Sequence, residues 1–248
     1  MDAKYRPQVN LFTIASDLKY FLISGYQALP FVIGGTFTVL GLYTAQYAML
    51  FFLLGYLIIA PLLAIVFNFL ASIIIPSQWT PKMVPWLLST NSDICNMLSI
   101  PQDSEGGGSS LKTIITPWLA MVAFFLGYMG MNAVSILRKP VEYPPKADEA
   151  TKKATDQKTM LRRSQTLVGL IVTVLLGALI LIIRVAFTEC DTVVGGILSL
   201  SFVFLGFAWY YLLSVVGDDR LSDVYGIANR LMTSSALSDA PYACLASA

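Results

Sequence analysis

Long runs of apolar residues, separated by short polar stretches, organise this chain. A helix that crosses a bilayer needs about 20 apolar residues in succession to span the hydrocarbon core. Runs of that length fall at residues 27–45, 48–75, 114–137, 164–187 and 194–216. The pattern therefore predicts an all-α, polytopic membrane protein with about five transmembrane helices.

The first two runs belong to one almost continuous apolar tract over residues 20–75. At a rise of about 1.5 Å per residue, one helix of that length is too long for a bilayer. The break is expected at Gly41–Gln46, which places Tyr43 at the membrane–water interface. Residues 27–75 are therefore predicted to form a tight helical hairpin. Pro61 is expected to kink its second helix, because proline removes a backbone donor.

The remaining segments are polar or amphipathic. Residues 1–26 and 217–248 carry apolar side chains at helical spacing, which predicts amphipathic tails that lie in the membrane interface or against another protein. Asp218 and Asp219 suit the start of a separate C-terminal helix, where they would cap it. Residues 76–113 form an expected outer loop, and 138–163 a basic loop whose composition permits helix from Ala147 onward.

The distribution of positive charge predicts the orientation. Only 12% of residues are charged, and eight of the basic ones lie within 138–163: Arg138, Lys139, Lys146, Lys152, Lys153, Lys158, Arg162 and Arg163. The positive-inside rule makes this loop cytoplasmic, with the loop at 76–113 and the N-terminus outside. A re-entrant segment within 20–75 would instead bring the N-terminus inside. The loop is either a solvated linker or a docking surface for an acidic partner or anionic lipid headgroups.

The three cysteines are Cys95, Cys190 and Cys244. On this topology Cys95 and Cys190 share the outer side and Cys244 lies on the other side, so Cys95 and Cys190 are the candidate disulfide; two free thiols are the alternative. The chain contains 0 histidines. Two cysteines without histidine fall short of the four ligands that structural zinc prefers, so no metal site is expected.

Within the predicted spans, Arg184 is the one ionisable residue. As a membrane-interface charge it is expected to reach the lipid headgroups or to pair with Glu189 or Asp191; a gating or substrate-binding arginine is the alternative. Asn68 and Asn132 are expected to form interhelical hydrogen bonds.

Small residues mark a helix-packing face in the fourth run. Gly169, Thr173 and Gly177 follow one another at i, i+4 and i+8, and such a stripe lets another helix approach closely. Whether that helix belongs to the same chain or to a second copy is left open by the sequence.

The residue types present also bear on function. Histidine is the commonest general base, and intramembrane carboxylates are the usual proton carriers of pumps; the predicted spans hold neither. These features argue against an enzyme and against active transport. No catalytic, cofactor-binding or metal-binding residue is expected, no cofactor and no nucleic-acid partner. A structural membrane role is favoured, with a small channel or transporter-like protein as the alternative.

The last part of the chain, about 140–248, carries a series of short motifs. Arg184 is followed by Thr188-Glu189-Cys190, then by Gly206-Phe207-Ala208-Trp209-Tyr210-Tyr211, Gly217-Asp218-Asp219, Asp223–Leu231 and Ala240–Leu245. This order resembles an uncharacterised family of multi-pass membrane proteins of nucleocytoplasmic large DNA viruses that infect algae and protists. The resemblance implies a structural component of the lipid membrane beneath the capsid, or of the host membrane from which it derives. It also implies contacts with other membrane or capsid proteins, or self-association, and it places Cys190 and Cys244 on recurrent cysteine positions of the family.

Overall fold

The computed structural model describes residues 11–75, 79, 84, 86–88, 113–141, 143, 149–187 and 190–225. Within this part of the chain the regular elements are helices, and five of them are long and apolar enough to cross a membrane. The elements are α1 (Leu11–Thr44), α2 (Tyr47–Leu53), the π-helix η1 (Leu54–Ile59), α3 (Ala60–Ile74), α4 (Pro117–Arg138), α5 (Glu149–Ile182), the π-helix η2 (Ile183–Phe187) and α6 (Val193–Ser222). The predicted all-α, five-span architecture is confirmed.

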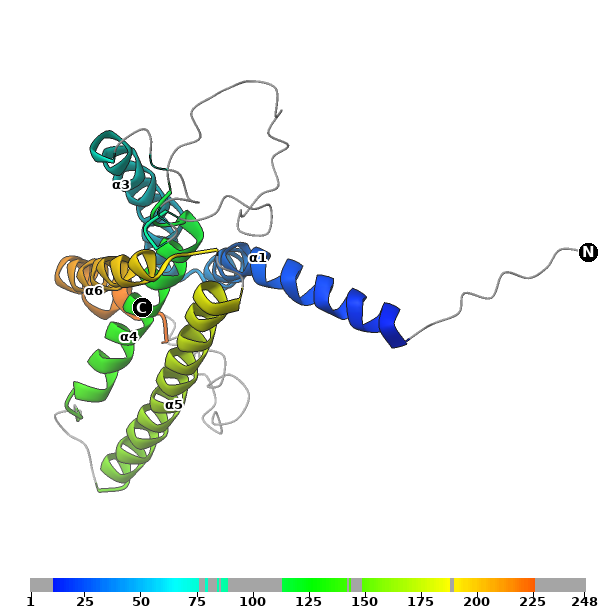
Figure 1. Ribbon diagram of the computed structural model, residues 1–248. Coiled ribbons are helices and arrows are strands. Elements are labelled where there is room, and N and C mark those ends of the chain that lie inside the picture. Colours follow the sequence, from blue (N-terminus) through cyan, green and yellow to red (C-terminus); the bar gives the residue numbers. More distant parts are fainter. Residues whose placement is uncertain are drawn as a thin grey trace, which may run out of the picture.

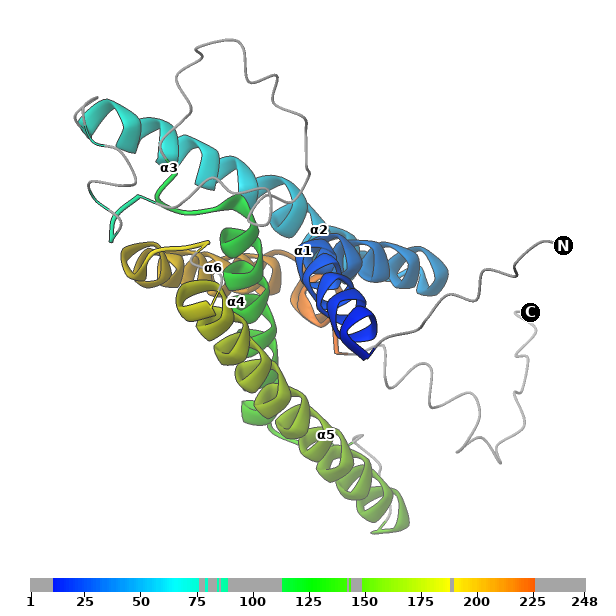
Figure 2. The same ribbon diagram turned by 45° about the vertical axis from the view of Figure 1, so that its right-hand side comes forward.

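Helix α4 lies at the centre of the molecule, and α1, α3, α5 and α6 extend away from it in different directions (Figures 1 and 2). In the most apolar stretch of α4, 67% of the residues are buried, against 11% in the corresponding stretch of α5. The aromatic side chains of Trp118, Phe124 and Tyr128 on α4 are at most 1% exposed. Helix α4 therefore contributes more of the buried core than any other helix, whereas most residues in the apolar stretches of the other spans are not buried.

The predicted break in the first apolar tract is confirmed. Helix α1 ends at Thr44 and α2 begins at Tyr47. Between them Ala45 takes a positive φ of 50°, and the amide of Gln46 donates to the carbonyl of Gly41 at 3.1 Å. This turn reverses the chain within two residues and produces the helical hairpin.

The sequence predicts that Pro61 kinks the second helix of the hairpin. In the structure a π-helical segment, η1, precedes this proline. Helices α2, η1 and α3 run on without interruption, and η1 ends two residues before the proline. Because Pro61 cannot donate a hydrogen bond and its ring crowds the preceding turn, that turn widens. The helix absorbs the proline locally and continues to Ile74.

The polar ends of two spans are helical. Helix α5 begins at Glu149, so the second part of the basic segment 138–163 is a helical extension of the fourth span. Helix α6 runs to Ser222, so the prediction that Asp218 and Asp219 cap a separate helix is wrong: both lie inside α6. The span and its polar end form one continuous helix, because Gly217 does not take the positive φ with which a glycine commonly ends a helix. The rest of the predicted C-terminal tail, 226–248, lies outside the described residues.

Two glycines bring the backbones of α4 and α6 into contact. A Cβ atom at Gly127 would lie 2.1 Å from the carbonyl oxygen of Val203, and one at Gly206 would lie 2.3 Å from that of Phe124. No side chain fits at either position without separating the helices. Aromatic rings pack beside this crossing, with Tyr128 and Tyr210 5.5 Å apart between ring centroids.

Candidate functional site

Arg184 is held at one end of the spans by a buried polar cluster. It lies in η2, its side chain is 1% exposed, and it forms an ion pair with Asp191, whose side chain is 0% exposed. Its guanidinium also donates to the hydroxyl of Thr116 at 3.2 Å. The carbonyl of Arg184 accepts the amide of Cys190 at 3.1 Å, which closes the turn between α5 and α6.

Aromatic side chains from two other helices complete this cluster. The Arg184 guanidinium lies 4.4 Å from the ring centroid of Trp118, a cation–π arrangement. Trp118 in turn donates from Nε1 to the carbonyl of Gln27 at 3.2 Å and packs on the ring of Tyr26. The cluster therefore joins α1, α4, η2 and the α5–α6 turn.

The predicted pairing of Arg184 with Asp191 is confirmed, whereas the predicted reach to lipid headgroups is wrong. The guanidinium points into the protein because Asp191, Thr116 and Trp118 together satisfy its charge there. Glu189, the other predicted partner, lies outside the described residues. Sequence reasoning missed Thr116 and Trp118. The Thr116-Pro117 pair was the available signal, because it marks a helix start: the Thr116 hydroxyl accepts from Leu119 N at 3.2 Å.

Cys190 lies beside this cluster, is 1% exposed and is disulfide-bonded. Cys95 and Cys244 both lie outside the described residues, so the pairing of Cys190 with Cys95 stays a prediction.

Digestion of the unreduced protein is expected to release a Cys95 peptide joined to a Cys190 peptide. Mass spectrometry before and after reduction identifies the pair. A link between Cys190 and Cys244 would instead contradict the predicted placement of these two residues on opposite sides of the membrane.

The two intramembrane asparagines are buried and hydrogen-bonded, but their partners are backbone groups just outside the helices and not side chains or backbone of another helix. Asn68 on α3 donates from Nδ2 to the carbonyl of Ile115 at 2.7 Å and accepts at Oδ1 from the amide of Ile114 at 3.0 Å. Asn132 on α4 is 0% exposed, and the amide orientation that suits its surroundings accepts from Val224 N at 2.9 Å. Asn68 therefore ties α3 to the segment that leads into α4, and Asn132 ties α4 to the segment that follows α6.

The stripe of Gly169, Thr173 and Gly177 packs within one chain. A Cβ atom at Gly177 would lie 2.6 Å from Leu126 on α4, and one at Gly169 would lie 3.5 Å from the ring of Tyr225. Burial raises the pKa of the Tyr225 hydroxyl above its usual value, so this side chain stays neutral against the stripe.

An apolar groove of about 630 Å³ lies between α4, α5 and α6. Thr173 and Gly177 of the stripe line it together with Leu126 and Phe207, and Arg138 is the one charged residue among its described lining residues. This apolar lining suits a hydrocarbon chain. An ion in the groove would find few oxygen atoms to replace its hydration shell.

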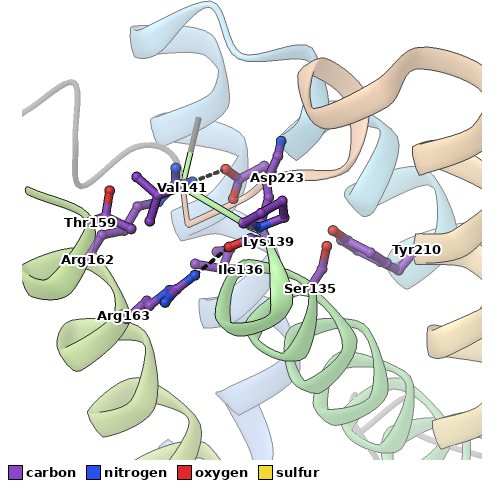
Figure 3. A pocket seen from close by; sticks show the side chains of 10 residues that line it. Ser135, Ile136, Lys139, Val141, Thr159, Arg162, Arg163, Tyr210 and Asp223 are labelled. Atoms are coloured by element: carbon purple, nitrogen blue, oxygen red, sulfur yellow. Dashed lines mark hydrogen bonds and ion pairs between the residues drawn. The ribbon is translucent and has the colours of Figure 1, made fainter. Parts of the chain in front are cut away.

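A second, polar pocket of about 120 Å³ lies at the C-terminal end of α4, whereas Arg184 contacts the start of that helix. Figure 3 shows the side chains that line it. Its walls come from the end of α4, from α5 and from α6 with the segment after it. Its lining residues are Ser135, Ile136, Lys139, Pro140, Val141, Thr159, Arg162, Arg163, Tyr210 and Asp223. We call this site the polar pocket.

Charged contacts hold the polar pocket together. Arg162 pairs with Asp223, and Arg163 donates to the carbonyl of Lys139 (Figure 3). Nearby, the Tyr143 hydroxyl donates to Asp156 at 2.7 Å, and this hydrogen bond raises the pKa of Tyr143. These contacts fasten the segment after α4 to α5.

Among the described residues, no group of three or more His, Cys, Asp or Glu side chains is placed to hold a metal ion. No family model, curated protein or solved structure matches this chain.

Proposed function

We propose that this protein is a structural integral membrane protein that organises a membrane and contacts neighbouring membrane or capsid proteins. The observation that carries the proposal is the outward exposure of apolar side chains on the helices around α4. Val39 on α1 is 67% exposed, Leu175 on α5 64% and Phe204 on α6 67%. Several separate apolar faces allow one copy to contact lipid and more than one neighbouring helix at once.

The resemblance of residues 140–248 to membrane proteins of large DNA viruses supports a virion inner membrane, or the host membrane from which it derives, as the location. The polar start of α5 supports contact with a second layer of protein. Lys152, Lys153 and Lys158 are exposed there, on a helix that continues directly from the span. A rigid helical extension presents these charges at a fixed position, as a docking surface requires.

Purified virus particles provide the test of location. The chain is expected to co-purify with the major capsid protein at a constant ratio through successive density gradients, as measured by quantitative mass spectrometry. It should leave the particles when mild detergent removes their membrane. An abundant host membrane protein serves as the contamination control. Recovery of the chain only in host membranes, at the same trace level in particles as that control, would contradict the proposed location.

Photo-crosslinking provides the test of lateral contact. A photoreactive amino acid at Leu175, which faces outward on α5, is expected to form protein-sized adducts in intact membranes. The matched control is Leu213 on α6, which is 3% exposed and should crosslink only within the chain. The same experiment is repeated at Val39 and Phe204. If all three positions form adducts with lipid only, the protein has no lateral protein partners, and that part of the proposal is refuted.

A further inference from the structure

The polar pocket is rich in cationic side chains, which the structural role does not require. Its described lining contains three cationic side chains, Lys139, Arg162 and Arg163, and one carboxylate, that of Asp223. Cationic side chains therefore outnumber carboxylates among the described residues that line this small cavity. We propose that the polar pocket binds a phosphate group, carried by an anionic lipid headgroup or present as a free anion.

The two arginines have hydrogen-bond donors to spare. Arg162 uses one terminal nitrogen for Asp223, and Arg163 uses one for the carbonyl of Lys139. The Nε atoms of both are buried without a hydrogen-bond partner in the part of the chain that is described. A buried hydrogen-bond donor without an acceptor is unfavourable. The hydrogen bond that such a donor forms is stronger when the donor belongs to a cation. A phosphate oxygen would satisfy such a donor and would complement the planar guanidinium geometry.

The size of the pocket selects a small anion. Its volume of about 120 Å³ is below the roughly 300 Å³ at which pockets for drug-sized ligands begin. The hydroxyls of Ser135 and Tyr210 also face it, and in Figure 3 they lie on the side opposite Arg162 and Thr159. One phosphate group has room between these walls, whereas an acyl chain belongs in the apolar groove.

The position of the pocket along the spans fits a membrane surface. It lies where α4 ends at Arg138 and where α5 changes from its charged first turns to its apolar stretch. Lipid phosphates lie at this level of a bilayer, and basic side chains near an anionic membrane surface are attracted to it. The pocket therefore faces the chemical group that it is suited to bind.

Ligand-dependent thermal stability of the full chain in neutral detergent tests the site. Dioctanoyl phosphatidic acid is expected to raise the midpoint of unfolding of the wild type, whereas dioctanoylglycerol, which lacks the phosphate, should not. Lys139→Gln and Arg163→Gln are each expected to weaken the apparent affinity at least about tenfold, because each removes a charged hydrogen-bond donor. Lys158→Gln is the matched control: it removes one positive charge from an exposed position on α5 outside the pocket, and it should bind like the wild type.

Two further arms decide the source of the phosphate and keep the test independent of folding defects. Stabilisation by inorganic phosphate as well as phosphatidic acid identifies a free-anion site, and stabilisation by the lipid alone identifies a headgroup site; both support the proposal. Asp223→Asn removes the opposing negative charge and is expected to strengthen binding, an effect that structural damage would not produce. The proposal fails if Lys158→Gln weakens binding as much as Arg163→Gln, if Asp223→Asn also weakens it, or if neither phosphate source stabilises the wild type. None of these outcomes bears on whether the protein is a virion component.

Discussion

Replacing Arg184 with methionine is expected to lower the free energy of unfolding by about 3–5 kcal/mol, because it leaves the buried carboxylate of Asp191 without its counter-charge. Both side chains are at most 1% exposed, so water cannot take over the lost interaction. The same change removes the hydrogen bond to Thr116 and the contact with the Trp118 ring, through which α4 and α1 are connected to the α5–α6 turn. Reversible unfolding in mixed detergent and SDS micelles measures the effect.

The double variant Arg184→Met/Asp191→Leu separates charge burial from packing. It removes both charges together, so it is expected to recover most of the stability that the single change loses. Arg162→Met is the control for an ion pair that is partly exposed, with side-chain exposures of 34% for Arg162 and 12% for Asp223. Its expected cost is at most about 1 kcal/mol. A loss at Arg184 no larger than that of the control would show that the buried polar cluster around Arg184 does not hold the helices together.

Gly127→Ala is expected to destabilise the protein by about 2–3 kcal/mol, because the added methyl group meets backbone rather than a movable side chain. A Cβ atom there would lie 2.1 Å from the carbonyl oxygen of Val203, so α4 and α6 must move apart. Separation of these helices also disturbs the adjacent Tyr128 hydroxyl, which donates to the carbonyl of Ser222 at 2.9 Å. The same unfolding measurement checks this prediction.

Gly130→Ala is the matched control, one turn further along the same helix. The nearest atom to a Cβ at Gly130 is 3.6 Å away, on the flexible ring of Phe207, which is an ordinary van der Waals distance. This change should be neutral or slightly stabilising, because alanine favours helix over glycine by up to about 1 kcal/mol. Equal effects at the two glycines would mean that helix propensity, and not the backbone contact, determines the outcome.

The sequence by itself determined the class of the protein and the approximate places of its five apolar spans. Runs of apolar residues long enough for a bilayer leave the backbone no alternative to helix, since each buried amide and carbonyl must bond within its own segment. The break near Gly41, the disturbance before Pro61 and the pairing of Arg184 with Asp191 follow from local chemistry over a few residues. Local reasoning found the break, expected a kink where the structure has a π-helical segment, and gave Asp191 as one of two possible partners of Arg184.

Only the tertiary structure decided which helix is central and which polar groups meet. All five spans are apolar, so hydropathy cannot distinguish the buried α4 from the exposed α5. Thr116 and Arg184 are 68 positions apart, and Arg162 and Asp223 are 61 apart. Their contacts depend on how α4, α5 and α6 cross. That crossing is set by the close backbone approach at Gly127 and Gly206, a property of the packed pair of helices that neither helix has alone.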